Sequence, residues 1–289
     1  MDGGLAPAVR KRKGLTPLLL LLPALALMAG VFAYPLAEAM WRSVADPTLG
    51  TQNYKWFATD IKNWEVLGRT LWVALLSAVI CLVLAYPYAY FMVVSGPRLR
   101  AALIVIVLIP FWTSLMIRSF AWIILLQDNG LINGALGFLG LGPFSMIRNT
   151  SGILIGMVQV LLPFMVLPLY ASMSNVDLRL LQASSSLGAR PSVSFVRVFV
   201  PLAMPGVISG SLLVFIQALG FYITPALLGS PSEMLISQYI YMQVNGQLQW
   251  GRGSVLGVIL LLVTLLLLGL LALLLRKSKR ATGNEGDLL

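Results

Sequence analysis

Six long apolar segments dominate this chain of 289 residues and limit what it can fold into. Each is long enough to cross the ~30 Å hydrocarbon core of a bilayer, which takes about 20 helical residues. Backbone hydrogen bonds must close within the protein in lipid, so helices are expected. A β-barrel would need ~10-residue segments of alternating polarity, and the chain has none. The predicted spans cover residues 15–38, 69–94, 101–126, 152–173, 203–228 and 253–275.

The first span follows the basic stretch 10–13, as the apolar region of a secretory signal peptide would. Such a region usually has 7–15 apolar residues, whereas this run continues to Glu38. We therefore expect an uncleaved first membrane span.

The distribution of Lys and Arg predicts the orientation of the chain. With six crossings, four basic segments lie on one side of the membrane: Arg10, Lys11, Arg12, Lys13; Arg98, Arg100; Arg179, Arg190, Arg197; and Arg276, Lys277, Lys279, Arg280. In the opposite loops, acidic residues offset the basic ones. The positive-inside rule then makes both termini cytoplasmic. The formal charge of +10 thus indicates membrane orientation rather than nucleic-acid binding.

The predicted spans divide the chain into one all-α polytopic membrane domain and two short ends. Residues 1–14 form a basic cytoplasmic N-terminus, 15–275 the six-helix domain, and 276–289 a cytoplasmic tail. A cytoplasmic loop, 174–202, joins the fourth and fifth spans.

The loop 174–202 contains the pattern of a short amphipathic helix. Val176, Leu180, Ala183 and Leu187 fall on one stripe at helical spacing. Gly188 suits the position just after a helix, and the nearby Pro191 prevents its continuation. A membrane protein that presents such a helix on a loop usually offers it to a groove on a partner.

The same loop resembles the EAA loop of ABC-importer permeases. That pattern runs Glu-Ala-Ala, three residues, Gly, nine residues, and an aliphatic residue two places before Leu-Pro. Here Gln182-Ala183-Ser184 opens the pattern, Gly188 and Val198 keep the spacing, and Val200-Pro201 closes it. Two residues of the opening triplet differ from the family's.

The resemblance implies that this helix docks into a cleft on a cytoplasmic ATPase. The residues that it assigns to coupling are Arg179, Gln182, Ala183, Ser184, Leu187, Gly188 and Arg190. We expect Ala183, Leu187 and Gly188 to form the centre of the dock. Gln182 in place of the family's glutamate forfeits a charge-assisted contact on the order of 1 kcal/mol or more.

Two further stretches look like the third span and the end of the fifth span of spermidine/putrescine-type permeases. The first is PFWTS at 110–114, followed by Arg118 and Trp122, and the second is GFYITPALLG at 220–229. This likeness implies the type I ABC-importer permease fold and a polyamine substrate. The same subgroup looks to include carriers of opines, amino-acid derivatives, phosphonates and ferric iron, so these stay alternatives.

The chain has no GxxxxGK[ST] stretch, so a separate ATPase dimer must hydrolyse ATP, and no cofactor is expected on this chain. Six helices make half of a pathway, and the subgroup usually pairs two different permeases. A heterodimer in a bacterial inner membrane, surrounded by membrane lipid, is therefore expected. A periplasmic binding protein would deliver substrate to loops 41–68, 127–151 and 229–252. We expect a transporter subunit and not an enzyme.

Candidate residues for the translocation pathway are Trp112, Arg118, Trp122, Phe221, Tyr222 and Thr224. Arg118 is a charge within an apolar segment, which often marks function. It also lies near the outer interface, where an Arg can simply reach water. Prolines within the spans could open a cavity at mid-depth or only kink a helix.

Two other classes of protein fit the sequence less well. A gradient-driven secondary transporter usually carries acids or a His relay within the membrane, and no acid lies between Asp128 and Asp177. An intramembrane enzyme needs a nucleophile and a base. The chain has no histidine and one cysteine, Cys81, which also argues against a His/Cys metal site.

Overall fold

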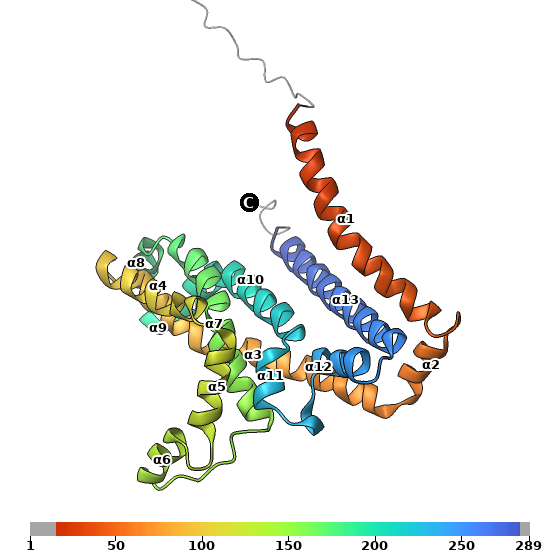
Figure 1. Ribbon diagram of the computed structural model, residues 1–289. Helices are drawn as coiled ribbons and strands as arrows, with labels where there is room; N and C mark the ends of the chain where they lie inside the picture. Colours follow the sequence, from red (N-terminus) through yellow and green to blue (C-terminus); the bar gives the residue numbers. More distant parts are fainter. Residues whose placement is uncertain (1–15, 284–289) are drawn as a thin grey trace, which may run out of the picture.

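Helices are the only regular secondary structure in the part of the chain that the computed structural model describes, residues 16–283, with side chains described from Leu21 to Leu273. The basic stretch 10–13 and the side chains of 276–280 lie outside these residues. The elements, shown in Figure 1, are α1 (Thr16–Ala45), α2 (Gln52–Thr59), α3 (Ile61–Val94), α4 (Pro97–Trp112), α5 (Leu115–Leu126), α6 (Leu131–Phe138), α7 (Thr150–Ser174), α8 (Arg179–Ser186), α9 (Pro191–Ser194), the π-helical turn η1 (Phe195–Phe199), α10 (Val200–Leu219), α11 (Ile223–Leu228), the 3₁₀ turn η2 (Pro231–Glu233), α12 (Ile236–Tyr241), the π-helical turn η3 (Met242–Gly246) and α13 (Trp250–Gly283).

Helices α3, α7 and α10 pack together and form the main core. Val73 of α3, Leu161 of α7 and Val214 of α10 are fully buried there. Small residues let α10 approach α7 closely: a Cβ at Gly206 would lie 2.5 Å from the Cβ of Ser172, and one at Gly210 would lie 2.8 Å from Sδ of Met165. Such close approach through small residues is typical of helix packing in membranes.

Helices α1 and α13 form an antiparallel pair that stands beside this core (Figure 1). The apolar side chains of α1 from Leu21 onward are largely exposed. A second, smaller core ties the lower end of the pair to the rest of the molecule, where Phe57, Leu67 and Leu256 are buried together.

Six helical segments among the described residues are long and apolar enough to cross a membrane, which confirms the predicted fold class. They are Leu21–Ala45, Ile61–Val94, Leu115–Phe138, Thr150–Ser174, Pro191–Leu219 and Trp250–Leu273.

The helix predicted over 101–126 is not continuous. The chain leaves helical geometry at Thr113 and Ser114, whose ψ angles are 141° and 133°. Pro110 cannot donate a backbone hydrogen bond, which weakens the last turn of α4. The oxygen of Pro110 instead accepts hydrogen bonds from the backbone N and Oγ1 of Thr113, at 3.3 and 3.0 Å.

The helix predicted over 203–228 starts earlier and also breaks. Helical structure begins at Pro191 and runs through η1 into α10. The wide turn η1 ends two residues before Pro201, whose ring would clash with a carbonyl in a regular α-helix. At the other end the helix stops at Gly220 and restarts at Ile223, because Pro225 could not continue the same hydrogen-bond ladder.

Two other predicted boundaries are wrong, because the helices continue past charged residues at which the predicted spans ended or began. The first span was expected to end at 38, but α1 runs on to Ala45, and an ion pair of 2.7 Å joins Glu38 to Arg42 one turn later. The second was expected to start at 69, but α3 begins at Ile61, where Oδ1 of Asp60 accepts the backbone N–H of Lys62. The remaining spans, predicted at 152–173 and 253–275, correspond to α7 and to α13.

Candidate functional site

The short helix α8 lies in the segment that joins α7 to α10, where the sequence predicts an amphipathic helix. Oδ1 of Asp177 accepts the backbone N–H of Arg179 at 2.9 Å and caps the first turn. At the other end Gly188 has a φ of +86°. The N–H of Gly188 donates to the oxygen of Ser185, and the N–H of Ala189 donates to the oxygen of Ser184. These two bonds form a Schellman motif, which ends the helix sharply.

Three of the four residues of the apolar stripe, those that follow Val176, are exposed. Leu187 is 89% exposed, Leu180 is 47% exposed, and Ala183 is also exposed. The inner side of the helix is formed by Leu181, which packs against the main core together with Val176 and Phe195. Exposed leucines on an ordered helix form a surface suited to a protein partner.

Polar residues surround this stripe. Arg179, Gln182 and Arg190 are exposed, and Ser184 is partly buried, with its Oγ donating to the oxygen of Leu181 at 2.9 Å. The structure thus brings the seven predicted coupling residues together on one short helix and the turn that follows it, with Gln182 and the two arginines free to meet a partner.

An aromatic cluster anchors the segment that follows α8. The ring of Phe195 lies 5.2 Å from that of Tyr90 and 5.3 Å from that of Phe199, and Tyr86 packs edge-on against Phe195 at 6.2 Å. Contacts of this kind stabilise the packing of α3 against η1. The prediction missed this cluster, although the spacing of Tyr86 and Tyr90, and of Phe195 and Phe199, by four residues was a usable signal.

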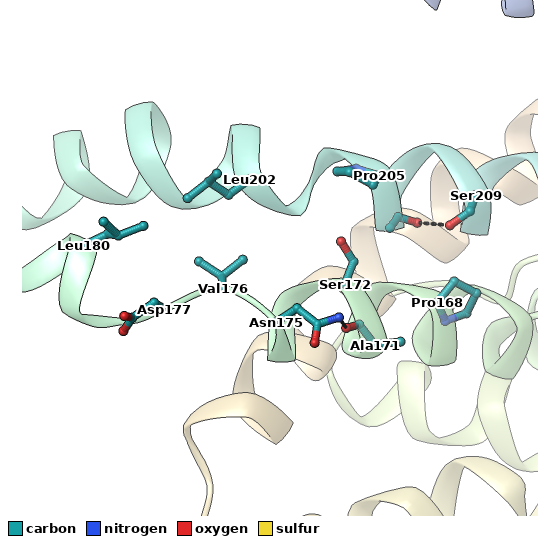
Figure 2. Close-up of a pocket in the computed structure, with 11 residues that line it drawn as sticks. Pro168, Ala171, Ser172, Asn175, Val176, Asp177, Leu180, Leu202, Pro205 and Ser209 are labelled. Atoms are coloured by element: carbon teal, nitrogen blue, oxygen red, sulfur yellow. Dashed lines mark hydrogen bonds between the residues drawn. The ribbon is translucent and has the colours of Figure 1, made fainter. Parts of the chain in front are cut away.

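A groove of about 680 Å³ runs between the end of α7 and the start of α10 and reaches the base of α8. Figure 2 shows Val176 and Leu180 on one side of it and Leu202 on the other. Pro168 and Pro205 line its inner part, where two backbone N–H donors are missing. Helix α8 itself packs against α9 and η1, which lead into α10.

The predicted pathway residues fall into separate groups. Trp112 ends α4 and is 74% exposed, on the other side of the break from Arg118 and Trp122. On α5, the Nε1 of Trp122 donates to Oε1 of Gln159 at 3.3 Å. The half-buried Arg118 has an Nε without a hydrogen-bond partner among the described residues.

Helix α11 packs against α5 and carries a second group. Thr224 is buried, and its Oγ1 lies 3.5 Å from Oγ of Ser119 on α5. Phe221 packs against the main core, whereas Tyr222 lies 5.2 Å from the ring of Tyr241.

Comparison with known proteins relates the chain to one kind of transporter. No family model matches it. It is 35% identical over 231 residues to the spermidine/putrescine transport system permease protein PotB of Escherichia coli, which covers 79% of this chain and 82% of that protein. It is 34% identical over 227 residues to PotB of Haemophilus influenzae, covering 75% and 79%. It is also 33% identical over 195 residues to the inner membrane ABC transporter permease protein YdcU of Escherichia coli, covering 63% and 62%.

Two solved structures share the fold. A bacterial ABC transporter involved in import of the acidic polysaccharide alginate aligns with a TM-score of 0.70 and 17% identity, covering 91% of this chain and 96% of that one. The alginate transporter in complex with its alginate-bound periplasmic protein aligns with a TM-score of 0.68, also at 17% identity, covering 87% and 91%. At this identity the likeness concerns the fold alone.

Proposed function

The chain belongs to the family of ABC-importer permease subunits that includes the spermidine/putrescine permeases, and we propose that it forms half of the membrane path for a polyamine. The observation that carries this proposal is the identity of 35% across 82% of a permease named for spermidine and putrescine. The alternatives to a polyamine are an opine, an amino-acid derivative, a phosphonate and ferric iron, which the resemblance also allows.

ATP hydrolysis by a partner subunit drives transport in this proposal, and α8 is the helix on which that partner docks. A cytoplasmic ATPase dimer would hold the exposed stripe of Leu180, Ala183 and Leu187 in a cleft. Arg179, Gln182, Ser184 and Arg190 would make polar contacts at its edge. The sharp stop at Gly188 sets the length of helix that enters the cleft.

Movement of α8 would then reach the membrane helices through two connections. One is the contact of α8 with α9 and η1, which run directly into α10, and the other is the aromatic cluster of Phe195 with Tyr86 and Tyr90. Because packed helices shift between discrete arrangements rather than bending continuously, closure of the two ATPases would switch the membrane path from opening on one side to opening on the other.

The remaining partners follow from what a half-pathway lacks. A second, non-identical permease would complete the path, a periplasmic binding protein would deliver the substrate, and membrane lipid would surround the six-helix domain 15–275. Both termini would be cytoplasmic in a bacterial inner membrane. Trp112, Arg118, Trp122, Phe221, Tyr222 and Thr224 would line or support the pathway.

Co-purification from the native membrane tests the proposal. We expect a tagged chain, solubilised gently, to bring down an ATPase and a second permease in fixed proportion. The reconstituted complex, supplied with its binding protein, should import spermidine or putrescine only when ATP is present. A chain that comes out alone, and whose Gln182→Glu variant also recovers no ATPase, would contradict the importer assignment. Import of a different solute would contradict the polyamine assignment only.

A further inference from the structure

We propose that the cavity between the end of α1 and the start of α13 binds the headgroup of a zwitterionic phospholipid with a primary ammonium, phosphatidylethanolamine. Its volume is about 450 Å³, within the range of about 300–1,000 Å³ that is usual for small-molecule sites. The lining residues that bear on the ligand are Tyr34, Glu38 and Arg42 of α1 and Trp250, Ser254 and Gly257 of α13. The proposal concerns lipid and does not depend on which solute the protein transports.

The cavity lies where the apolar stretches of this helix pair end. Residues 21–37 of α1 and 253–273 of α13 contain no charged residue, and on α1 the charges begin at Glu38. The cavity is therefore at the end of the pair that lies next to α2 (Figure 1). Tyr34 and Trp250 are exposed there, and Tyr and Trp are enriched at the level of the lipid headgroups. A headgroup of the surrounding bilayer can thus enter the cavity from the side.

An ion pair in the cavity offers both charges that a zwitterionic headgroup needs. Nε of Arg42 donates to Oε1 of Glu38 at 2.7 Å. Among the described residues, neither Nη atom of Arg42 nor Oε2 of Glu38 has a hydrogen-bond partner. The remaining guanidinium N–H groups suit a phosphate, and the remaining carboxylate oxygen suits the N–H of an ammonium.

Trp250 fixes the position of the guanidinium. Cζ of Arg42 lies 5.2 Å from the centroid of the indole ring, which is a cation–π contact. A guanidinium stacked in this way keeps its N–H groups in its own plane, where they can meet a phosphate. The hydroxyl of Ser254, which also lines the cavity, is a further donor for a phosphate oxygen.

The same groups distinguish among phospholipids. The carboxylate of Glu38 repels a headgroup that carries only negative charge, such as phosphatidylglycerol. The quaternary ammonium of phosphatidylcholine has no N–H to donate to it. A headgroup with a phosphate and a primary ammonium satisfies both members of the ion pair.

The other end of the cavity has room for the start of the acyl chains. A Cβ at Gly257 would meet nothing within 4 Å, whereas one at Gly253 would touch Cγ2 of Val244. The open space therefore lies over Gly257, from which α13 continues into its apolar stretch. This arrangement favours a lipid over a soluble molecule with the same headgroup.

The test is a titration of the full-length chain, purified in detergent with the subunits that accompany it and stripped of lipid. Phosphatidylethanolamine, phosphatidylcholine and phosphatidylglycerol with identical acyl chains are added, and bound lipid is counted by native mass spectrometry. We expect phosphatidylethanolamine to bind about tenfold more tightly than the other two, since a hydrogen bond to a charged group has about that effect. Equal affinities, or no saturable binding, would overturn the proposal.

A soluble headgroup distinguishes a lipid from a free ligand of the same chemistry. Glycerophosphoethanolamine has no acyl chains, so it should not displace the bound lipid. Displacement at comparable concentration would mean that the cavity takes a soluble ligand and would refute the lipid assignment.

Two charge variants test the ion pair. Arg42→Gln and Glu38→Gln should each reduce the preference for phosphatidylethanolamine to about twofold or less. Glu38→Gln should also strengthen the binding of phosphatidylglycerol, because it removes the charge that opposes it. Lys55→Gln on α2 and Glu65→Gln on α3 remove exposed charges outside the cavity and should leave the preference unchanged. Charge variants that keep the wild-type preference would exclude a role for the pair.

A second pair of variants fills space and leaves the charges in place. Gly257→Leu should lower the affinity for phosphatidylethanolamine about tenfold by occupying the cavity. Gly269→Leu is the matched control, because Gly269 lies on the same helix, is exposed, and has nothing within 4 Å of a Cβ. Equal binding by the two leucine variants would show that the lipid is held elsewhere.

Discussion

Gly188 shows how a single residue can set the shape of the docking surface. Its φ of +86° is a conformation that costs an L-residue about 1–2 kcal/mol, although a Cβ there would meet nothing within 4 Å. A substitution is therefore costly because of the backbone conformation, and it destabilises the turn that ends α8.

We expect Gly188→Val to abolish or strongly reduce transport while the protein still inserts in the membrane. Gly188→Asn should retain much more activity, because asparagine tolerates the left-handed conformation. ATPase activity and import, measured in proteoliposomes with equal amounts of complex, check this. Equal activity of the Val and Asn variants would argue against a role for the turn.

Gln182 is exposed on α8, so its replacement disturbs no internal contact that the structure records for its side chain. If the ATPase keeps the cation that meets the family's glutamate, Gln182→Glu should tighten docking about fivefold, as a gain of ~1 kcal/mol predicts. The gain should shrink as salt is added. Binding of the purified ATPase to the permease, titrated at two salt concentrations, measures it. Gln247→Glu, also exposed but remote in sequence, is the control and should change nothing.

At the scale of the elements, α10 packs closely on α7 through Gly206. A Cβ at Gly206 would lie 2.9 Å from the oxygen of Pro168 and 3.1 Å from Cα of Leu169, so the backbone of α7 would have to shift. Gly257 on α13 is also within a helix, but a Cβ there would meet nothing within 4 Å.

Gly206→Ala should therefore lower the thermal stability of the purified complex, with a cost of about 1–3 kcal/mol for overpacking. Gly257→Ala should leave stability unchanged or raise it slightly, because alanine favours a helix. Thermal unfolding in detergent, followed for both variants, distinguishes them. Identical Tm values would mean that α7 and α10 can move apart to accommodate the added Cβ without loss of stability.

At the scale of the whole molecule, the predicted orientation places α8 and the helix α6 on opposite sides of the membrane. In Figure 1, α8 lies near the upper end of the core and α6 at its lower end. Leu187 and Phe138 are suitable reporters of the two sides because they are 89% and 95% exposed.

Cysteine labelling reads the orientation directly. In a Cys81→Ala background, a membrane-impermeant maleimide should label Phe138→Cys in intact spheroplasts and Leu187→Cys only after permeabilisation. The native Cys81 is buried, so its removal prevents only a background signal. Labelling in the reverse pattern would place the termini outside and exclude docking to a cytoplasmic ATPase.

The sequence alone determined the class of the molecule and the place of its docking helix. Length and hydropathy predict the number of spans because crossing lipid requires a minimum helix length, and the spacing around Gly188 placed α8. The comparisons confirm the resemblance to spermidine/putrescine-type permeases. These features are local, so they can be read without knowing what packs against them.

Only the tertiary structure decided where helices break and which distant residues meet. Thr113 and Tyr222 lie at breaks within stretches that hydropathy reads as continuous, because lost hydrogen bonds at Pro110 and Pro225 change geometry without changing polarity. The contact between the rings of Tyr222 and Tyr241 depends on how α11 and α12 are folded back against the core. Side-chain proximity of this kind arises from the packing of whole elements, and no local pattern encodes it.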